Sequence, residues 1–447
     1  MSITVKRVVA YEISDSNGYP TIEVEMLLSN GFKIISSVSS DNVINTYGKR
    51  ELRDNDMSHY MGLGVKNAIA LINTVIAPRL IGMNPKDQVA FDNWLNRADP
   101  SPEKGKWGVN TTLVLSQVFT KAGAYCAGVP VFKYVNDLYR NMFRSELVLE
   151  KVPTPVFGML AGGKQVDMHE FHIIPSSSLT FTQSYEMAVD IFHSLQVLLD
   201  QLNIAFARSL HGELIPMRNT NMEMVDIIFD VLQRKNLKPG RHVFLGLNFV
   251  ANNYFMRGKY TLKDRPNALS TAEYYDFVAD LIGKHSVLLV EDPFASDDLD
   301  GWRKLFVNFG EQIYIVAHKF IGDNLDYLNQ METHKMYTSI VLKPSYFGTI
   351  TDTLKIIYSA KKHEISCMIS GDKNDTDDDF IADFAMGVQA DFIKFGAPAQ
   401  GERIAKYNRL LKIEQMAAMQ AAAARAIRQQ ALHATPIPKK FLDQIKK

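Results

Sequence analysis

The stretch Ser286–Phe294 (SVLLVEDPF) joins a continuous apolar run to two acidic residues. A short run of this kind is typical of a strand that is buried on both faces in a parallel sheet. Similar runs begin near Ile313 (IYIVAH), Ser339 (SIVLKPS), Ile365 (ISCMIS) and Asp391 (DFIKFGAP). Their starts lie about 26 residues apart, the length of one strand, one helix and two loops in a βα barrel. The second half of the chain is therefore predicted to be α/β and to form a TIM-type barrel.

Other segments extend this pattern. Residues 243–249 (VFLGLNF) fit another buried strand, and residues 351–361 fit a helix between two strands. Residues 415–433 are rich in Ala, Met and Gln, so propensity alone predicts a helix there. Amphipathic helices usually bury their apolar face on their own protein, so we expect this helix to pack on the barrel rather than on a partner.

The N-terminal part of the chain mixes strands and helices. Residues 22–28 (IEVEMLL) alternate acidic and apolar side chains and are followed by a turn at Gly31, which predicts a meander of antiparallel strands. Apolar residues at helical spacing predict a helix over 65–76 that Pro78 ends, and a second helix over 111–128. A smaller α+β domain is therefore expected before the barrel.

The composition excludes several classes of protein. The 447 residues carry 49 Lys+Arg and 49 Asp+Glu, whereas a protein that coats nucleic acid or a membrane surface needs a basic excess. Two cysteines, Cys126 and Cys367, are too few for a disulfide framework or a cysteine-based zinc site. We find no signal-peptide core and no apolar stretch of membrane-spanning length. We expect a cytoplasmic protein that binds no nucleic acid and does not insert into membranes.

Polar residues stand where the predicted strands end, and in a βα barrel the carboxyl ends of the strands carry the chemistry. These residues are Glu170, Asn248, Glu291, His318, Lys343, Gly371 and Lys394. Lys343 and Lys394 directly follow apolar strand residues, where a lysine is costly unless it faces a polar mouth or has a partner. Agreement among several strands favours a functional mouth over a structural ion pair with Glu291 or Glu170.

Short motifs run over nearly the whole chain. They are DSNGYPT (15–21), ELRD (51–54), YMG (60–62), IAP (76–78), GG (162–163), EF (170–171), EDPF (291–294), FIAD (380–383), KFGAP (394–398) and ERIAKYN (402–408). Together they resemble the enolase family, glycolytic lyases that interconvert 2-phosphoglycerate and phosphoenolpyruvate. The resemblance implies an α+β domain over 1–138 and a barrel over 139–447 that starts ββαα, usually assembled as a dimer.

The resemblance also implies a metal-dependent reaction, in which two Mg²⁺ ions neutralise an enolate while a lysine acts as base and a glutamic acid helps hydroxide to leave. It places the ligands of the first Mg²⁺ at Asn248, Glu291 and His318, where only Glu291 is still a carboxylate. The serine that binds the second Mg²⁺ falls at Val43. We expect no cofactor, with Mg²⁺ only if some family activity remains.

The acid and base positions of the family are partly retained. The resemblance places the base at Lys343 and its partner lysine at Lys394. Glu170 corresponds to a retained carboxylate. The general-acid glutamate falls at His211, although a shifted alignment would offer Glu213 instead.

The substrate-binding positions differ most from the family. Its phosphate-binding His-Arg-Ser run corresponds to Gly371, Asp372 and Lys373, so a carboxylate replaces the arginine and repels a phosphate. Lys373 would compensate only in part, as a point charge from a neighbouring position. The family's loop histidine corresponds to Gln165.

These losses affect the metals, the acid, the phosphate site and the closing loop, and one lost electrostatic group typically costs about a hundredfold in rate. We therefore predict an enolase-like pseudoenzyme with a structural, regulatory or partner-binding role. Its expected partner is a second copy or an enolase subunit. The alternative is an active or altered lyase that uses Lys343 as its base.

Overall fold

The N-terminal domain is a three-stranded antiparallel meander covered by helices. The computed structural model describes residues 2–39, 44–164, 166–218, 220–323 and 335–433, the last fourteen of these as backbone only. The strands β1 (Val5–Ser14), β2 (Pro20–Leu28) and β3 (Lys33–Ser37) pair in chain order, so the predicted meander is confirmed. The helices are η1 (Tyr60–Gly62), α1 (Lys66–Leu71), η2 (Ile72–Ile76), α2 (Ala77–Leu80), α3 (Gln88–Ala98), α4 (Val109–Ala127) and α5 (Val131–Phe143). The buried helix α4 packs on β2 and β3.

The helix that we predict to end at Pro78 continues past it, so that prediction is wrong. Helix α1 runs into the π-helical turn η2, and Pro78 then lies in the first turn of α2. Proline is tolerated in a first turn because the N–H groups there have no partner within the helix. The wide π turn thus restarts the helix at the position where a proline fits.

Eight strands close into a barrel. They are β4 (Thr154–Ala161), β5 (Glu170–Pro175), β8 (Val243–Asn248), β11 (Val287–Glu291), β12 (Tyr314–Ala317), β13 (Ser339–Leu342), β14 (Ser366–Ser370) and β15 (Phe392–Gly396). Strand β15 pairs with β4 and closes the sheet. Strand β5 runs antiparallel to both neighbours, and the other neighbouring barrel strands are parallel. The chain enters the barrel as two strands and then two helices, which confirms the predicted ββαα start.

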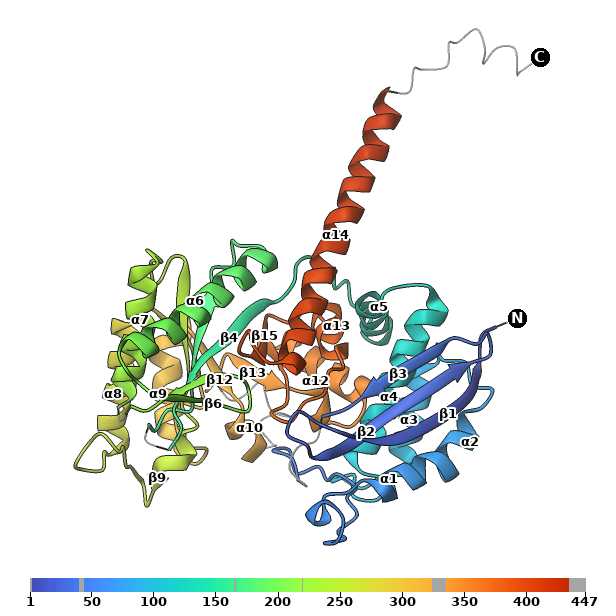
Figure 1. Ribbon diagram of the computed structural model, residues 1–447, viewed down its shortest axis with the longest axis horizontal. Helices are drawn as coiled ribbons and strands as arrows, with labels where there is room; N and C mark the ends of the chain where they lie inside the picture. The colour runs from blue at the N-terminus through green and yellow to red at the C-terminus, as the bar shows by residue number, and fades with distance from the viewer. Residues whose placement is uncertain (1, 40–43, 165, 219, 324–334, 434–447) are drawn as a thin grey trace.

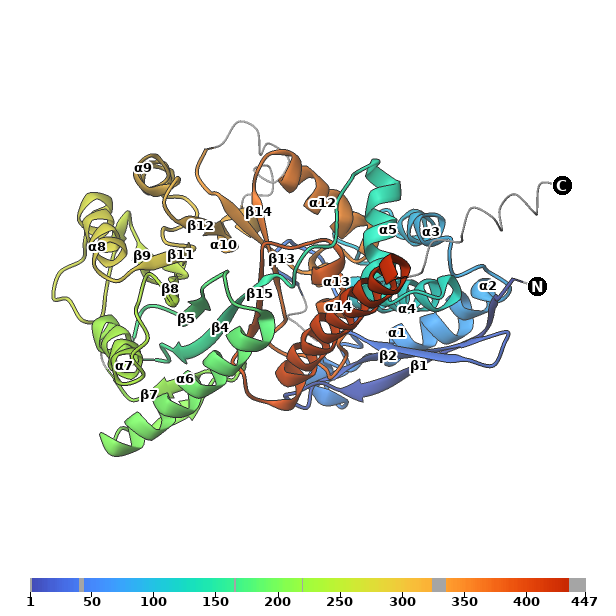
Figure 2. The same ribbon diagram turned by 90° about the horizontal axis from the view of Figure 1, so that it is seen from above.

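Helices surround the barrel (Figure 2). They are α6 (Phe181–Gln201), α7 (Asn221–Arg234), α8 (Thr271–Lys284), α9 (Leu299–Phe309), α10 (Lys319–Asp323), α12 (Ile350–Lys362), α13 (Phe380–Gly387) and α14 (Gly401–His433). Short elements are β6 (Phe206–Arg208), β7 (Leu214–Pro216), η3 (Ala251–Tyr254), β9 (Phe255–Met256), β10 (Lys259–Tyr260) and η4 (Pro344–Tyr346). Helices α6, α7 and α8 begin with capping boxes at Thr180, Thr220 and Ser270, which fix their first turns.

Helix α14 packs on α13 and α6 at its start and then leads away from the body of the molecule (Figure 1). Tyr407, Leu410 and Ile413 are buried, whereas residues 417–419 are exposed. The expectation that this helix packs on its own barrel therefore fails at 417–419, because the helix axis carries it past the barrel edge. From 420 onward its side chains lie outside the described part of the chain.

The N-terminal domain lies against loops at the carboxyl ends of the barrel strands (Figure 1). Ser116 Oγ on α4 accepts a hydrogen bond from the N–H of Ile350 at 2.9 Å, and Asp92 on α3 accepts one from Thr351 at 3.0 Å. Helix α5 spans the boundary that we predict between 138 and 139, and this boundary stays a prediction. Residues 144–153 then link α5 to β4.

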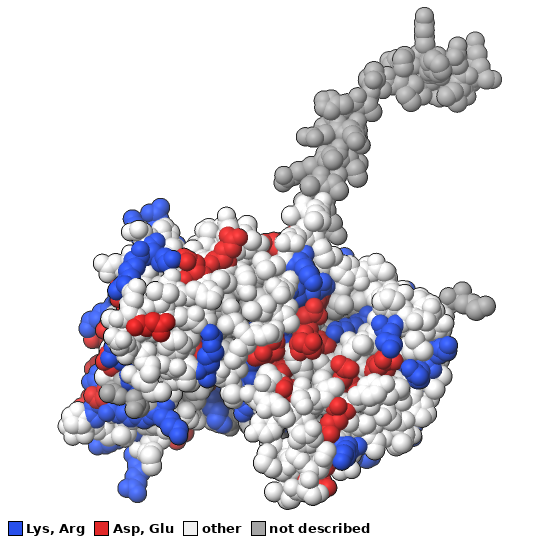
Figure 3. All heavy atoms as spheres, viewed as in Figure 1, with Lys and Arg blue, Asp and Glu red and all other residues white. Residues whose placement is uncertain are grey.

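The face shown in Figure 3 carries interspersed acidic and basic side chains, without one large patch of a single sign. This agrees with the equal numbers of acidic and basic residues. Among the described residues, no helix is long and apolar enough to cross a bilayer.

Candidate functional site

Three polar residues lie in one row at the mouth of the barrel. Glu170 on β5 pairs in register with Asn248 on β8, and Asn248 pairs with Glu291 on β11. Because β5 is antiparallel, its first residue lies beside the last residues of its neighbours. All three side chains are buried.

Lys394 on β15 joins this row from across the barrel. Its Nζ lies 2.6 Å from Glu291 Oε2 and 3.3 Å from Glu170 Oε2. Asn248 Nδ2 donates to the same Glu170 oxygen at 2.9 Å. One ammonium group therefore neutralises part of the charge of two buried carboxylates, which would otherwise repel each other.

The pKa values in this cluster follow from that pairing. Burial opposes the charge of Glu291, but Lys394 and His318 outweigh it and lower its pKa to about 2. Burial likewise opposes the charge of Glu170, and Lys394 and two histidines hold its pKa well below the usual value. Burial also disfavours the Lys394 ammonium, yet the two glutamates raise its pKa. Glu170, Glu291 and Lys394 are thus all charged at neutral pH.

His318, directly after β12, extends the cluster toward the N-terminal domain. Its Nδ1 lies 3.1 Å from Glu291 Oε1, and its Nε2 lies 2.6 Å from the hydroxyl of Tyr346. The Tyr346 ring stacks on Tyr47, which belongs to the N-terminal domain, with a centroid distance of 4.6 Å. Tyr346 was not among the predicted site residues, because no feature of the sequence near it indicates this contact.

Lys343 and Asp372 form a second pair at the mouth. Lys343 Nζ lies 3.2 Å from Asp372 Oδ1, and both side chains are about nine-tenths buried. Ser345 Oγ donates to Oδ1 at 3.2 Å, and Ser39 Oγ of the N-terminal domain donates to Oδ2. Burial opposes the charge of Asp372, but Lys343 and these two hydroxyls lower its pKa. Asp372 is therefore a fixed, charged and fully engaged carboxylate.

The backbone around Asp372 is held by Arg403, which is fully buried at the start of α14. Its Nη1 donates to the carbonyl of Asp372 at 2.5 Å, and its Nη2 donates to the carbonyl of Lys373 at 2.7 Å. A Cβ atom at Gly371 would lie 3.4 Å from Nη1 of the same guanidinium group. A cavity next to Asp372, lined also by Ser39 and Ser345, measures about 40 Å³, which is room for about one water molecule.

His211 lies in the loop between β6 and β7, and its side chain is unsuited to donate a proton as an imidazolium. Burial and the charge of Arg403 hold its pKa well below the usual value. Burial and the charge of Glu170 raise the pKa of the nearby Glu213, which accepts a hydrogen bond from Ser209 Oγ. Glu213 reaches the barrel wall because Gly158 has no side chain. A Cβ atom at Gly158 would lie 2.3 Å from Glu213 Oε1.

The residues present do not fit a family-type Mg²⁺ site. Both oxygens of Glu291 already have partners, and Asn248 and His318 supply no negative charge. Asn248 Oδ1 is a buried oxygen without a hydrogen-bond partner in the described residues, but one amide oxygen does not replace two carboxylates. Asp292 is close to Glu291 and His318, yet its oxygens accept the N–H groups of His318 and Lys319.

The predicted site residues that the structure describes thus fall into two groups, and His211 belongs to neither. Glu170, Asn248, Glu291, His318 and Lys394 form one cluster, and Lys343, Gly371, Asp372 and Lys373 belong to the second site with Arg403. Val43 and Gln165 lie outside the described residues. Sequence reasoning missed Ser39, Ser345 and Arg403, although Arg403 stands in the ERIAKYN motif that supported the family resemblance.

The comparisons with known proteins agree with this architecture. Residues 5–135 match the family model described as enolase, N-terminal domain, and residues 150–431 match enolase, C-terminal TIM barrel domain. A protein named enolase from Ehrlichia chaffeensis is 32% identical over 419 residues, which are 93% of this chain and 97% of that relative. The chain belongs to the enolase family. Its α/β fold and its small N-terminal domain are those of enolases.

Proposed function

We propose that this chain is a non-catalytic member of the enolase family that acts through contacts with a protein partner. The observation that carries this proposal is the ion pair of Lys343 and Asp372 at 3.2 Å. The family resemblance assigns the base to Lys343 and the phosphate-binding position to Asp372, so the pair supports the proposal at both positions.

The pair opposes the family reaction in two ways. A lysine must be free of its proton to act as a base, and a buried carboxylate beside it favours the charged form. The fixed negative charge of Asp372 also repels a substrate phosphate, where an arginine would bind it through two hydrogen bonds. Each effect alone lowers the rate, and the altered Mg²⁺ ligands Asn248 and His318 add a third loss.

The partner that this proposal favours is a second copy of the chain or an enolase subunit, since enolases commonly form dimers. A cytoplasmic location and the absence of nucleic-acid binding remain expectations from composition.

The decisive experiment is an assay of phosphoenolpyruvate formation from 2-phosphoglycerate at high Mg²⁺, with a true enolase beside it. We expect no turnover above the blank, and no heat of binding when 2-phosphoglycerate is titrated into the protein. A matched variant, Asp372→Arg, restores the charge of the phosphate site and should gain weak binding of 2-phosphoglycerate. Mg²⁺-dependent turnover by the unaltered chain would contradict the proposal.

A second candidate is a lyase of altered chemistry, which the retained Lys343, Lys394, Glu170 and Glu291 favour. It predicts that Lys343→Ala abolishes the biological activity of the chain, although the variant still folds and binds its partner. The non-catalytic proposal predicts that the variant keeps this biological activity, because partner binding alone produces it.

A further inference from the structure

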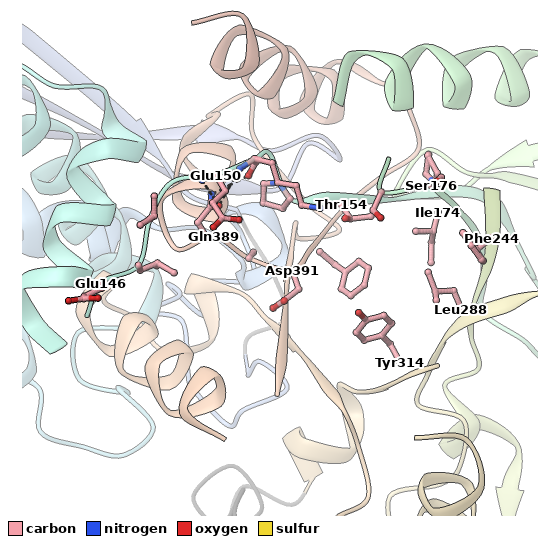
Figure 4. Close-up of a pocket in the computed structure, with 18 residues that line it drawn as sticks. Glu146, Glu150, Thr154, Ile174, Ser176, Phe244, Leu288, Tyr314, Gln389 and Asp391 are labelled. Carbon is pink, nitrogen blue, oxygen red and sulfur yellow. Dashed lines mark hydrogen bonds between the residues drawn. The ribbon is translucent and has the colours of Figure 1, made fainter. Parts of the chain in front are cut away.

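A cavity of about 750 Å³ lies at the end of the barrel opposite the mouth (Figure 4). It is lined by the first residues of parallel strands and the last residues of β5, which lie at the amino-terminal end of the barrel. This volume falls in the range of sites for small organic molecules. None of the residues of the mouth clusters lines it.

The inner wall of this cavity is apolar and partly aromatic. Phe244, Leu288 and Tyr314 are only half-buried and pack on the buried layer inside the barrel, which includes Phe392. Tyr314 meets Phe392 edge to face with a centroid distance of 4.7 Å. Exposed ring surface of this kind attracts flat apolar groups and, through the ring face, cations.

The charged residues around the cavity are mostly acidic. Asp391 lies on its wall, Glu146 and Glu150 lie at its rim, and Lys151 is the one basic residue among those that line it. Among the described residues, none of these three carboxylates has an ion-pair partner. One Asp391 oxygen accepts the N–H of Cys367 at 2.8 Å. A cation would thus find an apolar wall and an unpaired carboxylate together.

One side of the cavity is formed by the segment that links the two domains. Gln389 holds this segment, because its Oε1 accepts the N–H of Glu150 at 2.9 Å and its Nε2 donates to the carbonyl of Lys151 at 3.2 Å. Figure 4 shows Asp391 between this segment and Tyr314. Sites at domain junctions are common places for small ligands.

We propose that this cavity binds a small organic cation with a flat apolar body, of the aryl-alkylammonium class. The ring lies against Phe244, Leu288 and Tyr314, and the ammonium group pairs with Asp391. The proposal does not depend on whether the mouth is catalytic.

The test titrates the full chain with tryptamine, which is a cation at pH 7, by calorimetry. The neutral tryptophol and the anionic indole-3-propionate have the same ring and serve as matched probes. We expect tryptamine to bind at least about tenfold more tightly than tryptophol, and indole-3-propionate to give no heat. Equal binding of all three, or no binding of tryptamine at about 10 mM, overturns the proposal.

Two variants locate the binding. Asp391→Asn retains an oxygen for the Cys367 N–H and should weaken tryptamine at least about tenfold while leaving tryptophol unchanged. Phe244→Leu should weaken both probes, since it removes ring surface. The control Glu186→Gln changes an exposed carboxylate on α6 and should change nothing. Unaltered tryptamine binding in Asp391→Asn, with an unchanged unfolding midpoint, would place the probe elsewhere and overturn the assignment.

Discussion

The carboxylates at the two ends of the barrel differ in their ion-pair partners. At the mouth, Glu170, Glu291 and Asp372 each have a lysine ammonium within 3.3 Å. At the opposite end, Asp391 lines a cavity of about 750 Å³ and has no ion-pair partner among the described residues. A buried charge must carry its counter-ion with it, because losing water is costly, whereas an exposed charge stays hydrated. Burial thus ties the carboxylates of the mouth to their lysines, whereas the exposed Asp391 needs no counter-ion.

Removing the ammonium group of Lys394 from the mouth should destabilise the chain most. Lys394→Met leaves Glu170 and Glu291 unneutralised in a buried row and should lower the free energy of unfolding at pH 7 by about 3 to 5 kcal/mol. Urea unfolding measures it. The control Lys235→Met breaks an exposed pair with Asp190 of 2.7 Å and should cost less than about 1 kcal/mol. Equal losses in the two variants would show that the buried ion pairs of Lys394 stabilise the chain no more than an exposed pair does.

Acidification should lower the free energy of unfolding by a smaller amount than Lys394→Met does. The pKa of Glu291 is lowered to about 2 in the folded chain, so its stabilisation is complete above its ordinary pKa and is lost as the pH falls toward 2. The loss from this group amounts to about 3 kcal/mol. Urea unfolding between pH 7 and pH 2.5 measures the slope. Glu291→Gln should flatten that slope, and an unchanged slope in the variant would assign the acid sensitivity to other groups.

Breaking the pair of Lys343 and Asp372 should lower the free energy of unfolding by less than the loss of Lys394 does. It should also convert the site into one that accepts anions. Asp372→Asn removes the carboxylate 3.2 Å from Lys343 and should cost about 2 to 3 kcal/mol. It should also produce line broadening of inorganic phosphate in phosphorus NMR. Asp137→Asn, which breaks a pair with Lys133 whose side chains are 40% and 41% exposed, is the control and should do neither. Phosphate broadening by the unaltered chain would mean that Asp372 does not exclude anions.

A change at the contact between the domains should destabilise the chain least. Ser39→Ala removes a hydroxyl that donates to Asp372 and should lower the free energy of unfolding by about 1 kcal/mol. Calorimetric melting measures it, with Ser194→Ala on the exposed side of α6 as the control. A loss in the double variant Ser39→Ala/Asp372→Asn equal to the sum of the single losses would count against coupling of the two groups.

Several parts of the fold were predictable because they rest on local patterns. The strand runs at 287–291 and 339–342 were found from continuous apolar residues, and the antiparallel meander from alternation. The end of the helix at Pro78 was predicted wrongly, because a π turn before it changed the position of the proline within the helix. The exposure at 417–419 was also missed, because propensity does not say where a helix leaves the body.

Periodicity and motifs were enough to predict the family, the barrel and the set of polar residues at the strand ends. The partners of these residues became known only from the folded chain. It brought Lys394 to Glu291 across the barrel, and Ser39 of one domain to Asp372 of the other. It also placed Asp391 beside the linker at the far end of the barrel. Pairing depends on distances between residues far apart in the chain, and such distances are fixed when the barrel closes and the domains pack.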